Sequence, residues 1–185
     1  MCTFFPAGTS HVCRSIKSLR RLMSKKQYYR IAEKKYPKDH VFKGSGKRPL
    51  QDRFPEVEDI LERRRPKGKN GRGDSVYLKD SKDFSKVGVT YGEGYVHTVD
   101  AVGRVEQRDL GWTGVLQQRY FPDKRFRKNL LPHLTDDEVA DKWWAGEASE
   151  KPEWEWVAEG ATVVDVENDR VTVKPDSPLL NAFNK

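Results

Sequence analysis

Cysteine and histidine are the first candidates for chemistry in this chain, because their side chains bind metals and serve as nucleophiles or bases. The two cysteines, Cys2 and Cys13, form no Cys-x-x-Cys pair, and the four histidines form no His-x-x-x-His pair. The Gly-x-Ser-x-Gly turn of many serine hydrolases does not occur. Residues 43–48 (KGSGKR) lack the spacing of a nucleotide-binding phosphate loop. We therefore expect a protein that is not an enzyme, with no catalytic residue, no metal site and no cofactor.

A stronger pattern is the interleaving of basic and aromatic residues. Residues 17–35 combine lysines and arginines with Tyr28 and Tyr29, and residues 119–128 read RYFPDKRFRK. Cations neutralise phosphates, while aromatic rings and guanidinium planes stack on unpaired bases. The pattern predicts an RNA-binding surface, although the same aromatic residues would also suit a hydrophobic core surrounded by solvated cations. The predicted RNA contacts are Arg14, Lys17, Arg20, Arg21, Lys25, Lys26, Lys34, Lys35, Lys43, Lys47, Arg48, Arg63, Arg64, Arg65, Lys67, Lys69, Arg72, Arg125, Arg127 and Lys128.

The positive charge is concentrated toward the N-terminus. The chain has 185 residues and a net charge of +7. Residues 1–50 contain 13 Lys and Arg but two acidic residues, residues 51–100 contain 10 of each kind, and residues 101–185 contain 12 basic and 16 acidic residues. Such asymmetry indicates that the basic end contacts nucleic acid or serves in targeting.

The first 32 residues contain arginine, lysine and serine but no acidic residue. This composition is typical of an organellar transit peptide, and an uncleaved basic arm that binds RNA is the alternative.

No run of 18 apolar residues is present, so we expect no membrane-spanning helix. Two cysteines are too few for a disulfide-stabilised scaffold.

The elements that would position these residues change in kind along the chain. Residues 14–35 have apolar side chains at helical spacing, and residues 55–65 begin with a proline followed by acidic residues, so both segments predict helices. Residues 66–74 (PKGKNGRGD) contain no apolar side chain and predict a flexible basic linker at the main domain boundary. Short alternating runs predict strands over residues 75–79, 86–90, 95–99 and 102–108.

The next segments predict a loop and a helix. Residues 110–132 have no regular period and predict an irregular segment. Thr135 and Glu138 have the spacing of a capping box, so we expect a helix to begin after Thr135 and to end at Gly146.

Residues 161–174 alternate apolar and polar side chains on both sides of Asn168-Asp169, which predicts a β-hairpin. Together the elements predict an α+β fold with a basic, partly helical and extended N-terminal arm, a small β-rich body, and a C-terminal helix with the hairpin. The predicted regions are residues 1–32 (transit peptide or basic arm), 33–74 (basic helical or extended linker region), 75–132 (β-rich body) and 133–185 (acidic helix and hairpin).

Glycine spacing in residues 92–105 (GEGYVHTVDAVGRV) carries a resemblance to a known family. Gly92, Tyr95, Gly103 and Val105 are spaced as in bacterial-type large-subunit ribosomal protein twenty-seven, which this segment resembles. The resemblance covers about 30 residues, 76–105. It implies a small β-structured protein whose basic N-terminal extension reaches ribosomal RNA, and organellar members of the family carry transit peptides and C-terminal additions.

A second resemblance concerns Val76-Tyr77 and residues 86–90 (KVGVT). These segments resemble the two strand motifs of the GIY-YIG nucleases. The resemblance would imply a metal-dependent nuclease with Tyr77 near a metal-activated water, and it remains an alternative.

The charge distribution and the ribosomal resemblance predict a non-enzymatic, RNA-binding structural component of a large ribonucleoprotein, specifically the large subunit of an organellar (mitochondrial) ribosome. We expect ribosomal RNA as its partner and no contact with a membrane. Neighbouring ribosomal proteins would contact the acidic, tryptophan-rich C-terminal part, because aromatic residues are enriched at protein–protein interfaces. A structural protein of a virus or phage, with the basic arm on the packaged genome, is the other alternative. The aromatic side chains expected to contact neighbouring ribosomal proteins are Trp143, Trp144, Trp154 and Trp156.

Overall fold

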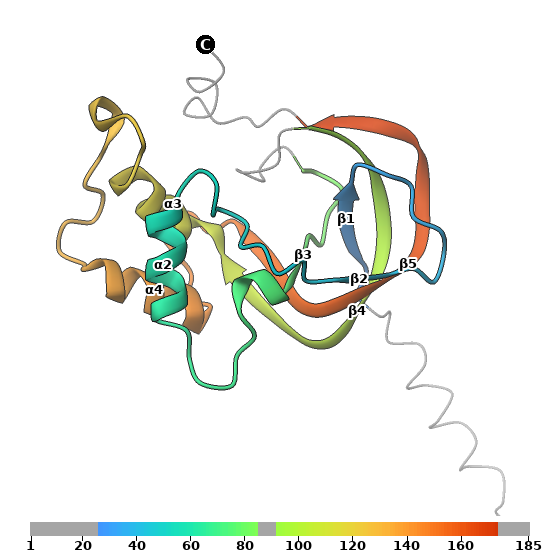
Figure 1. Cartoon of the computed structure of the whole chain (residues 1–185), viewed down its shortest axis with the longest axis horizontal. Helices are drawn as coiled ribbons and strands as arrows, with labels where there is room; N and C mark the ends of the chain where they lie inside the picture. The colour runs from blue at the N-terminus through green and yellow to red at the C-terminus, as the bar shows by residue number, and fades with distance from the viewer. Residues whose placement is uncertain (1–25, 85–91, 174–185) are drawn as a thin grey trace, which may run out of the picture.

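The computed structural model describes residues 26–84 and 92–173. Within these residues the chain forms a five-stranded antiparallel sheet and three α-helices, so the predicted α+β class is confirmed. The helices lie together at one end of the molecule and the curled sheet lies at the other (Figure 1).

Two long strands form the centre of the sheet. β4 (Gly92–Asp109) and β5 (Trp154–Val173) pair antiparallel along their whole length. β1 (Tyr28–Ala32) pairs with β4, while β2 (Val41–Lys43) and β3 (Val76–Leu78) both pair with β5. The sheet therefore includes segments from all four of the regions that the sequence predicts.

The sheet curls until its two sides meet. The pairing of β4 with β5 changes register at three places, one of them between Val102 and Val105, where Gly103 has a φ of 77°. Such a bulge bends and twists a strand, and glycine adopts its positive φ without steric cost. Tyr29 and Lys79 then join β1 to β3 through two backbone hydrogen bonds of 2.8 and 2.9 Å. The closed sheet encloses an apolar core that includes Val76, Leu78, Val99, Ala161 and Val163.

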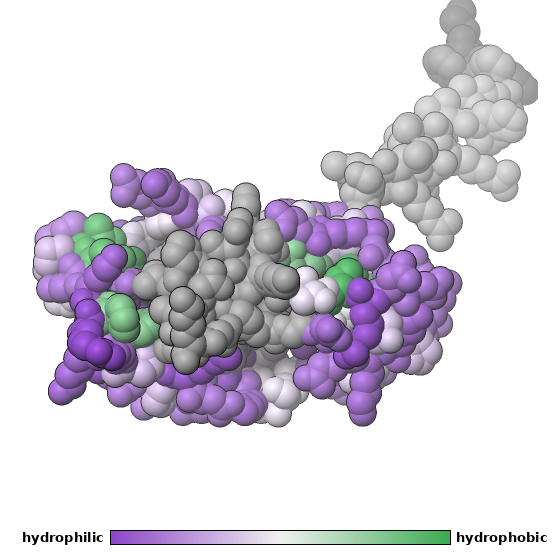
Figure 2. Space-filling model, turned by 90° about the horizontal axis from the view of Figure 1, so that it is seen from above, coloured by the Kyte–Doolittle hydropathy of each residue, from purple (hydrophilic) through white to green (hydrophobic). Residues whose placement is uncertain are grey.

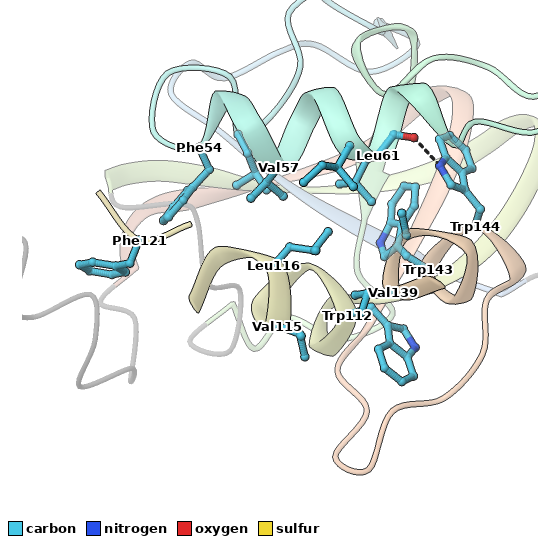
Figure 3. Packing of buried hydrophobic residues seen from close by; sticks show 13 residues of the cluster. Phe54, Val57, Leu61, Trp112, Val115, Leu116, Phe121, Val139, Trp143 and Trp144 are labelled. Atoms are coloured by element: carbon cyan, nitrogen blue, oxygen red, sulfur yellow. Dashed lines mark hydrogen bonds between the residues drawn. The ribbon is translucent and has the colours of Figure 1, made fainter. Parts of the chain in front are cut away.

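The helices α2 (Pro55–Arg63), α3 (Leu110–Arg119) and α4 (Asp136–Ala145) form a second core beside the sheet. The indole nitrogen of Trp144 donates to the backbone carbonyl of Leu61 (2.7 Å), which ties α4 to α2 (Figure 3). No helix in the described part of the chain is long and apolar enough to cross a membrane. The apolar side chains of this core include Leu61, Leu116, Val139 and Trp143 (Figure 3).

Two helices begin and end where local sequence signals place them. Pro55 occupies the first turn of α2, and α2 ends with Arg63 in its last turn. At α4, Thr135 and Glu138 form the predicted capping box, and Gly146 ends the helix with a φ of 70°. Both helix predictions are confirmed.

The helix predicted over residues 14–35 is wrong for the part that the structure describes. Residues 28–32 form β1, because aromatic and β-branched side chains suit a strand once the edge of β4 supplies hydrogen-bond partners. Residues 14–25 lie outside the described residues.

The irregular segment predicted over residues 110–132 is wrong for its first half, which forms α3. Asp109 caps this helix, since its carboxylate accepts a hydrogen bond from the Gly111 backbone N–H (2.8 Å). Trp112, Val115 and Leu116 then face the helical core.

The hairpin predicted over residues 161–174 is also wrong. β5 continues through Asn168-Asp169, because β4 pairs beyond that point and sets Tyr95 opposite Arg170. The strands predicted over residues 75–79, 95–99 and 102–108 are confirmed, the last two as parts of β4. The strand predicted over residues 86–90 lies outside the described residues.

The predicted flexible linker is partly a buried turn. Residues Arg72–Asp74 form a 3-10 helix, and the Gly46 backbone N–H donates to the Gly73 carbonyl (2.9 Å). Gly71, Arg72 and Gly73 are buried. This part of the linker therefore belongs to the folded body.

Candidate nucleic-acid interface

The described residues carry no excess of positive charge. Residues 26–84 and 92–173 together contain 27 Lys and Arg and 27 Asp and Glu. Residues 1–25 contain five Lys and Arg and no acidic residue, and they lie outside the described residues. The surface seen in Figure 2 is largely hydrophilic, with a few small apolar patches. A nucleic-acid interface on the folded body would therefore have to be a local cluster of exposed cations.

Several predicted RNA contacts are engaged in ion pairs between α2 and α4. Arg63 binds Asp137 (2.5 Å), and Arg64 binds both carboxylate oxygens of Asp141 (2.9 and 2.5 Å). The hydrogen bond from Arg63 lowers the pKa of Asp137 below its ordinary value. These cations hold two helices together, so their charge is already matched within the fold.

Other predicted contacts are matched in the same way. Lys47 pairs with Asp52 (2.6 Å), Arg48 pairs with Asp59 (3.0 Å), and Arg65 pairs with Glu62 (3.5 Å). Lys26 pairs with Asp80 (3.2 Å) and places its ammonium 3.4 Å from the ring centroid of Trp156. Lys35 donates to the Asn168 side chain (3.2 Å), and Lys69 pairs with Glu106.

Arg72, a predicted RNA contact, is buried in the structure and paired with Glu58. Its side chain is 3% exposed and donates to both carboxylate oxygens of Glu58 (2.9 and 3.2 Å). Its guanidinium lies 4.5 Å from the ring centroid of Trp143. The Arg72 guanidinium is therefore paired inside the fold and does not belong to the exposed basic surface.

The tryptophan anchors predicted for neighbouring proteins also need correction. Trp143 and Trp144 lie in the helical core, stacked edge to face at 4.7 Å (Figure 3). Trp154 and Trp156 are partly buried. The tryptophans of α4 therefore stabilise the fold and are not exposed anchors.

The remaining predicted cations are exposed. Lys34, Lys43, Lys67 and Lys128 have no ion-pair partner within the part of the chain that the structure describes. They come from four different loops and strands. Lys128 lies close in the chain to three further exposed cations, Lys124, Arg125 and Arg127. These neighbours belong to the loop that joins α3 to α4.

This basic loop (residues 120–130) projects at the helical end of the molecule (Figure 1). It presents Lys124, Arg125, Arg127 and Lys128 to solvent, and the only carboxylate in it is Asp123, which pairs with Arg125 (2.6 Å). Phe126 is 45% exposed, and its ring packs against Phe121 with the ring centroids 5.9 Å apart. The loop thus combines cations with an exposed aromatic ring.

Arg119 holds the basic loop in place. Its guanidinium donates to the backbone carbonyls of Leu130, Leu131 and Leu134 (2.7–3.1 Å) and to the carboxylate of Asp136 (2.7 Å). At the other end of the loop, Arg127 donates to the Phe121 carbonyl (2.8 Å). The exposed cations are therefore presented from a preorganised backbone. The composition of residues 119–128 marks this segment, but the RNA contacts predicted from the sequence do not include the exposed Lys124, and the supporting role of Arg119 was not predicted.

The residues considered for metal and nuclease chemistry have structural partners. His97 is buried and accepts a hydrogen bond from the Tyr36 backbone N–H (3.0 Å), and burial lowers its pKa. The Tyr77 hydroxyl donates to the Arg72 carbonyl (3.0 Å), and burial raises its pKa. Among the described residues, no group of three or more His, Cys, Asp or Glu side chains could hold a metal ion. The second nuclease motif, residues 86–90, lies outside them.

Comparisons with models of protein families, with curated proteins and with solved structures find no match for this chain.

Proposed function

We propose that this protein is a non-enzymatic, RNA-binding structural component of a large ribonucleoprotein, and specifically of the large subunit of an organellar, mitochondrial ribosome. The observation that carries the proposal is the basic loop, which presents four exposed cations and Phe126 and whose last residue, Leu130, is bound by Arg119. Loops of this composition suit unpaired RNA, since cations follow the backbone while an aromatic ring stacks on a base.

The N-terminal segment supports the same proposal. Residues 1–25 carry five cations and no carboxylate, whereas the described residues are electrically balanced. The unmatched charge of an arm of this kind calls for an anionic partner or an import receptor. Because β1 begins at Tyr28 and closes the sheet, a transit peptide would have to be cleaved before residue 26.

Contact with neighbouring ribosomal proteins is part of the proposal, and it would use exposed acidic residues of the C-terminal part. Several face solvent next to α4 and β5, including Glu147, Glu150 and Glu153. Their negative charge would keep this surface away from RNA.

The test measures binding of the full chain to a single-stranded RNA 20-mer of mixed sequence over a range of salt concentrations. The variant Lys124→Gln/Lys128→Gln should bind more weakly and should reduce the slope of log affinity against log salt by roughly 0.7 for each lost phosphate contact. Phe126→Ala should weaken binding about tenfold through the loss of one stacked base.

The control variant Lys82→Gln/Arg170→Gln removes two exposed cations outside the basic loop, one in the segment after β3 and one in β5. It should bind RNA as the unmodified chain does. Equal affinity and equal salt slope for the loop variant and the control would contradict the basic loop as an RNA contact.

A further inference from the structure

A layer of buried charged side chains separates the helical core from the core of the sheet. Arg72, Arg108, Glu58, Glu155 and Lys79 are each less than 10% exposed. Buried charges destabilise a fold unless ion pairs and hydrogen bonds compensate them. Most of this layer is compensated, since Arg72 is bound to Glu58 and the Lys79 ammonium donates to the Trp154 carbonyl (2.9 Å).

A pocket of about 40 Å³ adjoins this layer and is partly open to solvent. Arg104, Glu106 and Arg108 line it from alternate positions of β4, so they share one face of the strand. Arg72 lines it from the 3-10 helix and Lys69 from the loop that follows α2. The aromatic rings of Tyr77, Trp143 and Trp144 complete the wall.

The pocket has more cationic donors than acceptors. Lys69 and Arg108 both bind Glu106, and Arg104 lies 3.9 Å from the same carboxylate. Attraction and hydrogen bonds from these cations outweigh burial and hold the pKa of Glu106 below its ordinary value. The one other carboxylate that lines the pocket is Glu159.

Two buried donors in this wall are unpaired. The Arg72 Nη1 and the Arg108 Nε have no hydrogen-bond partner within the described residues, and both side chains are at least nine-tenths buried. An unpaired buried donor is costly, and such groups in native proteins are normally satisfied by a bound molecule or ion. The two residues that carry these unpaired donors line the pocket beside Lys69 and Arg104, which are partly exposed.

We infer that this pocket binds a phosphate-type oxyanion. Arginine forks bind phosphate through charge-assisted hydrogen bonds, and cationic side chains from a loop, a 3-10 helix and a strand line the pocket. The volume of about 40 Å³ accommodates a group of a few non-hydrogen atoms. The phosphate is either a free ion or one phosphate of a nucleic-acid chain whose remainder lies outside the pocket, near the exposed Arg104. The inference goes beyond the proposed function, because a free phosphate ion would suffice.

The test titrates the full chain with inorganic phosphate at constant ionic strength in sodium chloride, followed by tryptophan fluorescence and by ³¹P NMR. Trp143 is a natural reporter, since Arg72 lies against its ring. We expect saturable binding, and Arg104→Gln should weaken it about threefold to tenfold because a charge-assisted contact is lost. Lys69→Gln should act in the same direction.

Arg170→Gln is the matched control, because it removes an exposed arginine at the far end of β5. It should leave phosphate affinity unchanged, and circular dichroism should be the same for all variants. Absence of saturable phosphate binding to the unmodified chain, or equal affinities for Arg104→Gln and Arg170→Gln, would overturn the inference.

A second arm of the experiment identifies the source of the phosphate. If Arg104→Gln also weakens binding of the RNA 20-mer and free phosphate competes with that RNA, the site holds an RNA phosphate. If Arg104→Gln weakens phosphate binding alone, the site holds a free ion. RNA binding that depends on the basic loop, without any phosphate binding, would overturn this inference and leave the proposed function standing.

Discussion

Replacing Glu155 with glutamine should stabilise the protein progressively more as pH rises. Glu155 is buried, and its Oε1 has no hydrogen-bond partner among the described residues. Burial raises the pKa of this carboxyl from 4.5 to about 7, even though the nearby cations Arg72, Lys79 and Arg108 act in the opposite direction. The folded protein therefore holds a proton on Glu155 at pH values where the unfolded chain has lost it.

The sign and size of the effect follow from this difference in proton affinity. Below pH 4.5 the side chain is protonated in both states and costs nothing. Between pH 4.5 and about 7 the unfolded state ionises first, so stability falls as pH rises, and above pH 7 the full cost is present. Because one pKa unit corresponds to about 1.4 kcal/mol, the ionised carboxylate costs the folded state about 3 kcal/mol.

The assay is urea denaturation of the unmodified chain and of Glu155→Gln at pH 5, 6, 7 and 8. Glutamine imitates the protonated carboxyl, so the difference in unfolding free energy between the two proteins should grow by about 2–3 kcal/mol from pH 5 to pH 8. Glu153→Gln, an exposed position two residues earlier, shows how much comes from the loss of a surface charge. A difference that stays constant with pH, or that shrinks as pH rises, would refute the reasoning, because Glu155 would then be ionised and stabilised by its cationic neighbours.

Three further predictions concern the fold. Gly103→Ala should destabilise the protein by about 1–2 kcal/mol in urea denaturation, because Gly103 has a positive φ and lies against the Glu159 side chain; unchanged stability would mean that this bulge is not strained by a side chain. Arg119→Ala should cost about 2–3 kcal/mol and should make residues 120–134 the first site of limited proteolysis, since several carbonyls lose their donor; cleavage elsewhere would show that Arg119 does not hold the loop. A chain that begins at residue 26 should keep the circular dichroism of the full chain, whereas one that begins at residue 33 should lose cooperative unfolding because β1 is missing; equal behaviour of the two would show that β1 does not contribute to closure.

The sequence predicts the elements whose signals are local. The α4 helix is set by Thr135, Glu138 and Gly146, which act within one turn of its ends. The α2 helix begins at a proline followed by acidic residues, for the same kind of reason. In each case the interactions that fix the boundary lie within a few residues of it.

The failures occur where a distant partner decides the conformation. Residues 28–32 contain side chains that suit a helix or a strand, and the edge of β4 selects the strand. β5 passes straight through Asn168-Asp169 because β4 continues opposite it, although the dipeptide on its own favours a turn. The two glycines of α3 lower its helix propensity, so the sequence did not predict this helix. It depends on the Asp109 cap and on packing in the helical core.

The candidate interface could be predicted only in part, because the partners of several cations lie far away in the chain. Residues 119–128 stood out by composition, and the structure places four of their five cations on one exposed loop, whereas Arg119 belongs to α3. The sequence does not show that Arg63 and Arg64 face the acidic residues of α4, more than 70 positions later. Nor does it show that Glu58 holds Arg72 in the interior. A count of basic residues therefore overstates how much charge remains for RNA.

The most direct test of the proposed function is density-gradient fractionation of a native lysate from the source cells. The protein is followed by mass spectrometry at moderate and high salt, with and without RNase. The proposal predicts that it migrates with a large ribosomal subunit of the organelle, that high salt does not release it, and that RNase does. Migration as a small free species under every condition would contradict the proposal.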